Sequence, residues 1–91
     1  MDYYYKDYND VDAMIMYYHC RDYYCYRQIE IWKDKILLYD LDHHRADEHS
    51  FLSDGRASIN LIPEKMLISA EEFNLNWEKY RHVAHNYRPD Y

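Results

Sequence analysis

Glycine is almost absent from this chain: Gly55 is the single glycine among 91 residues. Loops that hold the phosphates of nucleotides need several glycines at fixed spacing, because the backbone must approach the phosphates closely. One glycine cannot build such a loop. The sequence therefore argues against nucleotide-dependent chemistry, and no cofactor is expected.

Long apolar runs are also missing. The longest, residues 13–18 and 36–39, fall far short of the ~20 residues that a membrane-spanning helix needs. The N-terminus carries Asp2 and tyrosines where a secretory signal requires basic and then aliphatic residues. We therefore expect one cytoplasmic domain, residues 1–91, without membrane contact.

Cysteine is scarce, with Cys20 and Cys25 as the only two. On one continuous strand, residues five apart point to opposite faces, so a disulfide between them would require a turn through residues 21–24. Two cysteines in a cytoplasmic chain are usually reduced. The sequence therefore predicts two free thiols.

Tyrosine, in contrast, is abundant and concentrated at the N-terminus. Nine of the thirteen tyrosines fall within the first 26 residues, together with five aspartates. Tyrosine combines a rigid apolar face with a polar tip and is enriched where one macromolecule binds another. Aliphatic residues are too few to fill a core alone, so some tyrosines are expected inside and the others on an acidic aromatic surface.

The charge of the chain decides which partner suits that surface. Aromatic faces serve either single-stranded nucleic acid or protein, but a nucleic-acid site also needs a basic groove along the phosphates. The formal charge is −6, and residues 1–26 hold only Lys6 and Arg21 as basic residues. We therefore expect a larger protein with a basic surface as partner, and no direct contact with nucleic acid.

The clearest predicted element is a helix near the C-terminus, from about Ala70 to Asn86. Ser69 and Glu72 form a capping box, and Ile68 and Phe73 occupy the hydrophobic-staple positions around it. Apolar residues then recur at intervals of four and three, which predicts one narrow stripe packed on the core. Leu75 lies outside the stripe and is expected to be exposed. The stripe consists of Phe73, Trp77, Tyr80, Ala84 and Tyr87.

The middle of the chain predicts a β-hairpin over about residues 23–41. Residues 23–32 and 36–41 are rich in aromatic and β-branched residues, and Lys33-Asp34-Lys35 separates them. That turn lacks the preferred Asn-Gly or Asp-Gly pair. A helix through residues 29–37 is the alternative.

The remaining segments complete an α+β prediction. Residues 12–20 fit either a short helix capped by Asp12 or a strand, and their aromatic content favours the strand. Residues 42–55 are polar and predict a long loop, whereas 57–62 predict a short strand that stops at Pro63. We expect a small antiparallel sheet, the hairpin plus one or two short strands, packed against one C-terminal helix at about 70–86.

Two groups of histidines suggest metal binding as an alternative function. Imidazole and carboxylate groups are the ligands that zinc or manganese prefers, and three histidines lie among the carboxylates of residues 40–49. Two more are three residues apart on the predicted helix. Neither spacing matches a defined metal signature, so a solvated loop and a helix terminus explain them more simply. The candidate ligands are His43, His44, His49, His82 and His85.

No catalytic constellation is recognisable. His19 and Cys20 are adjacent, which on a strand sends their side chains to opposite faces. The serines have no nucleophile elbow around them, and no carboxylate pair sits in an apolar segment that would raise a pKa. The chain is not expected to be an enzyme.

The leading hypothesis is a small acidic, tyrosine-rich protein-binding module. One form of it is a viral protein, a phage- or mobile-element-type inhibitor, or an immunity or antitoxin protein, that docks on the basic nucleic-acid-binding surface of a larger protein. Aspartates would replace phosphates and tyrosines would replace bases, an analogy of surface chemistry alone. A subunit of a larger assembly, including a homodimer, is the other alternative. The expected contact residues are Tyr3, Tyr4, Tyr5, Asp7, Tyr8, Asp10, Asp12, Tyr17, Tyr18, Asp22, Tyr23 and Tyr24.

Overall fold

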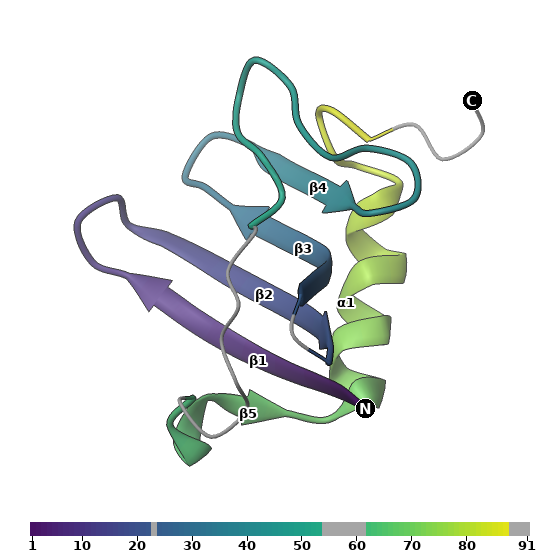
Figure 1. Ribbon diagram of the computed structural model, residues 1–91. Coiled ribbons are helices and arrows are strands. Elements are labelled where there is room, and N and C mark those ends of the chain that lie inside the picture. Colours follow the sequence, from purple (N-terminus) through teal and green to yellow (C-terminus); the bar gives the residue numbers. More distant parts are fainter. Residues whose placement is uncertain (23, 54–61, 88–91) are drawn as a thin grey trace.

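A five-stranded antiparallel sheet with one helix on a face of it forms the fold, as a computed structural model shows (Figure 1). The structure describes residues 1–22, 24–53 and 62–87. The strand order is β4-β3-β2-β1-β5, and the predicted α+β class is confirmed. The strands are β1 (Asp2–Asn9), β2 (Met14–Arg21), β3 (Tyr24–Ile31), β4 (Ile36–Asp40) and β5 (Leu67–Ile68); the 3₁₀ helix η2 is Glu64–Met66 and the helix α1 is Ala70–Arg81.

The first four strands form a meander of consecutive hairpins. The predicted hairpin is present as β3 and β4, and Trp32 N donates to Lys35 O (2.9 Å) across its turn. Residues 14–21 are strand β2, so the strand interpretation of this segment is correct. Asp12 caps no helix; it lies in the turn before β2, where Ala13 has a positive φ of 52°. Four local hairpin strands thus make up most of the sheet.

The chain then crosses to the far side of β1. β5 pairs with β1 only at Tyr4↔Ile68 and Tyr5↔Leu67. The predicted strand at 57–62 lies almost wholly outside the described residues, and Ile62 itself belongs to no strand. Because β5 is so short, no described strand lies along the outer edge of β1, the edge opposite β2, beyond Tyr5.

The main core lies between α1 and the sheet. The predicted helix stripe is buried here: Phe73 and Trp77 contact sheet residues, and Tyr80 packs at the margin. Leu75 points away and is exposed, as expected. The stripe is therefore core rather than interface. The buried members of this cluster are Tyr17, Ile29, Leu38, Phe73, Trp77, Ala84 and Tyr87.

The start of α1 agrees with its sequence signal. Ser69 Oγ accepts a hydrogen bond from Glu72 N (3.0 Å), which satisfies one of the free amides at the helix N-terminus. Ile68, the residue before the cap, packs against the cluster that contains Phe73. The cap and the apolar contact together fix the angle at which the chain enters the helix.

The helix ends earlier than predicted, at Arg81 instead of Asn86. The next residues turn back and bind the outer edge of β4: His85 N donates to Ile36 O (2.9 Å), and the Asn86 amide bonds the backbone of Leu38. These long-range hydrogen bonds replace the helical ones that the sequence pattern implied. Ala84 and Tyr87 are still buried, although they lie beyond the helix.

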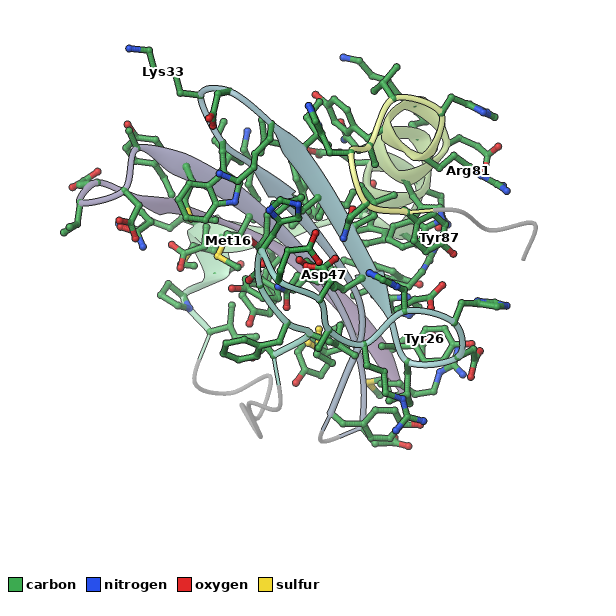
Figure 2. All side chains as sticks on the ribbon, turned by 90° about the horizontal axis from the view of Figure 1, so that it is seen from above. Met16, Tyr26, Lys33, Asp47, Arg81 and Tyr87 are labelled. Carbon is green, nitrogen blue, oxygen red and sulfur yellow. The ribbon has the colours of Figure 1, made fainter. Side chains whose placement is uncertain are left out.

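The other face of the sheet is covered by the loop that follows β4. Residues 42–53 form the predicted loop, with isolated bridges at Asp40↔His44 and Ala46↔Phe51; residues 54 and 55 lie outside the described part. Side chains therefore fill both sides of the sheet (Figure 2). Among the described helices, none is long and apolar enough to cross a membrane. The cluster on this face contains Tyr3, Cys20 and Cys25, with Tyr5, Tyr18, Leu52 and Ile62 against it.

Candidate protein-binding site at the tip of the first hairpin

The structure divides the N-terminal tyrosines between the core and the surface. Tyr3 and Tyr17 are each only 7% exposed, so their selection as contact residues is wrong. Tyr4 and Tyr5 are half-buried, as is Tyr18. Only Tyr8 and Tyr24 are exposed, and Tyr23 lies outside the described residues.

The reason for this burial is that both faces of the sheet are covered. Tyr4 stacks on His19 (ring centroids 4.4 Å apart) on the α1 side, whereas Tyr5 stacks on Tyr18 (4.6 Å) on the loop side. Successive residues of a strand point to opposite faces, so a run of tyrosines supplies side chains to both layers. Burial raises the pKa of Tyr5 and Tyr18 well above its usual range.

The residues that stay exposed gather at two opposite ends of β1 and β2. The first end is the β1–β2 turn, which projects past the other turns and away from α1 (Figure 1). The second end is the β2–β3 turn beside the N-terminus. β1 separates the two ends by about 24 Å at ~3.4 Å per residue. The expected contact surface is therefore not continuous. The first end exposes Asp7, Tyr8, Asp10, Val11 and Asp12, and the second exposes Met1, Asp22 and Tyr24.

The first end, called the hairpin tip here (residues 7–12), is held in shape by Asn9. Its Oδ1 accepts from Val11 N (3.0 Å) and from Asp12 N (3.1 Å), and its Nδ2 donates to Asp12 Oδ2 (3.2 Å). Such side-chain bonds to the following backbone are typical of Asn in tight turns. They hold the turn in which Val11 is 92% exposed; Tyr8, three residues earlier in the chain, is 59% exposed.

The tip and the opposite end differ in how their charges are paired. At the opposite end, Asp22 binds the N-terminal amine (2.6 Å), and Asp2 binds His19 (2.8 Å) and Arg21 (3.1 Å). The hydrogen bonds from His19 and Arg21 lower the pKa of Asp2. These carboxylates are therefore neutralised by their neighbours.

The tip carboxylates carry their charge without such neutralisation. Within the described part of the chain, Asp7, Asp10 and Asp12 take part in no ion pair. The ammonium of Lys6, the residue before the tip, sits 5.5 Å from the centroid of the Tyr17 ring. Salt screens charges over ~8 Å at physiological ionic strength, so the tip and the opposite end present separate fields. The tip is the more acidic of the two.

The histidines are not assembled as metal ligands. His43 binds Asp40 (3.0 Å), and His44 binds Asp47 (2.7 Å). His85 Nδ1 accepts from Ile36 N (3.2 Å) at the β4 edge. Within the described residues, no group of three or more His, Cys, Asp or Glu side chains is placed to hold a metal ion. The remaining two candidates, His49 and His82, are exposed.

Two carboxylates, the buried Asp40 and the partly buried Asp47, have a structural task instead. Asp40 Oδ1 accepts from the amides of His43 (2.6 Å) and His44 (3.0 Å), so it folds the start of the loop. Asp47 accepts from Tyr39 Oη (2.8 Å) and from Asn86 Nδ2 (2.8 Å). Burial alone would raise the pKa of Asp47, but its hydrogen-bond donors, His44 first, hold that pKa well below its usual range. Figure 2 shows Asp47 in the loop, in front of the sheet.

Sequence reasoning missed Val11 and Asn9 at the tip. The signal for both was present: an isolated valine within Asn9-Asp10-Val11-Asp12 is an apolar residue in a segment made of turn formers. Such a valine has no strand or helix pattern that would bury it.

No protein-family model, no curated protein and no solved structure matches this chain.

Proposed function

We propose that this chain is a small protein-binding module whose hairpin tip contacts a basic surface of a larger protein. The observation that carries the proposal is the combination found at the tip: three carboxylates that form no ion pair among the described residues alternate in sequence with two exposed side chains, Tyr8 and Val11. Apolar side chains supply contact area that is removed from water on binding. The carboxylates speed encounter with a basic partner and reject acidic ones.

A nucleic-acid-binding face is the basic surface that this arrangement suits best. Such a face is built to neutralise regularly spaced negative charges and to contact flat rings. At the tip, Asp7, Asp10 and Asp12 supply the charges and Tyr8 supplies the ring. We therefore retain an inhibitor, immunity or antitoxin role as the concrete form of the proposal.

Homodimerisation through the edge of β1 beyond Tyr5, along which no described strand lies, is the less favourable use of the same region. Two copies paired there as antiparallel strands would bring Asp7 and Asp10 of one copy near those of the other. Like charges on neighbouring strands destabilise their pairing, and natural proteins use charged residues on edge strands to prevent it. A basic partner meets no such repulsion.

Affinity capture with two matched double variants tests the proposal. The tip variant Tyr8→Ala/Asp10→Asn removes a ring and a charge at one end; the control Tyr24→Ala/Asp22→Asn removes the same groups at the other end. We expect the wild type and the control to retain the same basic partner at low salt, with affinity that falls as salt rises. The tip variant should bind roughly a hundredfold more weakly, since one exposed anchor and one charge are each worth ~1–2 kcal/mol.

Equal capture by the tip variant and the wild type would overturn the assignment of the site. Loss of binding in the control alone would move the site to the opposite end. A retained partner that is acidic, or whose binding does not change with salt, would contradict the proposed chemistry. Circular dichroism of each variant establishes that the fold is intact.

A further inference from the structure

Cys20 and Cys25 face each other across the β2–β3 hairpin. They are direct register partners, and the next pair, Arg21↔Tyr24, closes the turn. Directly opposed residues of antiparallel strands have Cα atoms about 4.5 or 5.5 Å apart. A disulfide spans Cα distances of about 4.4–6.8 Å. The backbone therefore needs no movement to accommodate a bond between the two sulfurs.

A β-bulge is what places the two cysteines on the same face. His19 pairs with Arg27 while Cys20 pairs with Cys25, so Tyr26 is an extra residue in β3 with no partner on β2. Without it, the alternation along β3 would send Cys25 to the α1 side, because Ile29 faces α1 and lies an even number of residues away. With it, both cysteines lie in the cluster on the loop side.

The surroundings give the two thiols different roles. Cys25 Sγ donates toward Arg27 O (3.4 Å). Hydrogen bonds from Cys25, and then from Tyr3, lower the pKa of Cys20, although burial opposes them. The bond with Cys20 together with burial raises the pKa of Cys25 far above its usual range. Cys20 is thus the sulfur that becomes the thiolate.

We propose that Cys20 and Cys25 form a reversible intramolecular disulfide when the protein meets hydrogen peroxide or a disulfide oxidant such as oxidised glutathione. The register pairing, the bulge at Tyr26 and the shared buried cluster carry this inference. The fold holds the two cysteines in direct register while both thiols are free.

With peroxide, the reaction proceeds in two steps. The Cys20 thiolate attacks one peroxide oxygen, an S–O bond forms, the O–O bond breaks, and the leaving hydroxide takes a proton to become water. The Cys25 sulfur then attacks the sulfenic sulfur of Cys20, an S–S bond forms, the S–O bond breaks, and a second water leaves with the Cys25 proton. Two thiols lose two electrons in total, and one peroxide is reduced to two waters.

The bond would fix the turn that carries Asp22 and Tyr24. Together with Met1, these two residues form the exposed part of the end opposite the hairpin tip. Both sulfurs are buried, 3–4% exposed, so the oxidant reaches them only when the covering loop or the turn opens locally. Oxidation should therefore be slow. The disulfide should form within each molecule, without cross-links between molecules.

Equilibration with glutathione redox buffers tests the proposal. The wild-type protein is equilibrated folded and, separately, in urea, and the free thiols are trapped with a maleimide and counted by intact mass. We expect the equilibrium constant for the internal disulfide to be at least roughly tenfold larger in the folded protein, which corresponds to a reduction potential about 30 mV lower. Downfield Cβ chemical shifts of both cysteines in the folded, oxidised protein should accompany the loss of two hydrogens in mass.

The single variants Cys20→Ser and Cys25→Ser serve as controls. Each has one thiol left, so each should give only the mixed disulfide with glutathione. Because only four residues separate the cysteines, the disulfide can form in the unfolded chain as well. An equilibrium constant for the internal disulfide that is equal or smaller in the folded protein than in urea would therefore overturn the proposal. Oxidation of the wild type to linked dimers would also overturn it. The comparison of folded and urea-unfolded wild type remains valid even if a variant does not fold.

Discussion

Asn86 bonds both backbone groups of Leu38: its Oδ1 accepts from Leu38 N (2.9 Å) and its Nδ2 donates to Leu38 O (3.0 Å). An exposed strand edge offers the same unpaired groups to any other chain. One side chain from beyond α1 therefore does at β4 what a further strand would do. Its Nδ2 also reaches Asp47 Oδ2 (2.8 Å), which ties the C-terminal segment to the loop.

Replacement of Asn86 should weaken the fold clearly. Asn86→Ala leaves the amide and carbonyl of Leu38, and one lone pair of Asp47, without their partner. We expect a loss of about 2–3 kcal/mol in the free energy of unfolding, since unsatisfied buried polar groups cost ~1–3 kcal/mol. Asn76→Ala is the control, because Asn76 bonds only the carbonyl of Glu72 within α1. Urea denaturation measures both, and equal losses would contradict the role given to Asn86.

The pH dependence of the free energy of unfolding should follow two carboxylates, Asp40 at the end of β4 and Asp47 in the loop. The pKa values of Asp40 and Asp47 are lower in the folded protein than in an unfolded chain, where aspartate titrates near ~3.9. Such groups stabilise the fold above that value, and their contribution is lost as the pH falls toward the folded pKa. We expect the free energy of unfolding to decline steadily below about pH 4.

Asp47→Asn tests the source of that decline. The variant should be less stable at pH 7, by ~1–3 kcal/mol, because its amide cannot accept the five donors that converge on the carboxylate. Below about pH 4 its stability should change less steeply than that of the wild type. Asp34→Asn, at an exposed turn residue, should leave the slope unchanged. If the free energy of unfolding fell equally steeply below about pH 4 in the wild type and in Asp47→Asn, Asp47 would not be a source of the decline.

The N-cap of α1 offers a local test. Ser69→Ala removes the acceptor for Glu72 N, and we expect a loss of about 1 kcal/mol. Ser69→Asp retains an acceptor and adds a charge that favours the helix N-terminus, so it should restore the stability. Thermal unfolding followed by circular dichroism measures the three proteins. A Ser69→Asp protein as weak as Ser69→Ala would show that the cap is unimportant.

The two sides of α1 should respond very differently to truncation. Phe73 is fully buried between the helix and the sheet, and Phe73→Ala should cost ~3–5 kcal/mol. Leu75 is 66% exposed, and Leu75→Ala should change the free energy of unfolding by less than about 0.5 kcal/mol. Urea denaturation of the two variants compares them directly. A large effect at Leu75 would indicate that this face of the helix is covered in solution.

The sequence predicted well those elements whose causes are local. Ser69 and Glu72 mark the start of α1 because the cap joins residues three apart, and the β3–β4 hairpin follows from apolar runs on either side of residues 33–35. The end of α1 was predicted wrongly because its cause is distant. The bonds of Asn86 to Leu38 cross 48 positions of the chain, and no local pattern records them.

The candidate site was predicted only in part, for a similar reason. Asp7, Tyr8, Asp10 and Asp12 are exposed as expected. Tyr17 is buried under α1, whereas Tyr3 is buried because the loop covers the second face of the sheet. That cover depends on Gln28, whose Nε2 bonds Phe51 O (3.1 Å) from 23 positions away. A run of tyrosines gives the same sequence pattern whether one face of the sheet is covered or both are.

The position of α1 at the end of the described chain also has a consequence for synthesis on the ribosome. The hairpins of β1 to β4 involve neighbouring segments and can pair as soon as residue 40 has emerged. Until Phe73 and Trp77 follow, the nascent sheet exposes Tyr17, Ile29 and Leu38 to solvent. A translational pause between residues 40 and 69 would prolong that exposure, and chains stalled there would be the ones most prone to aggregate.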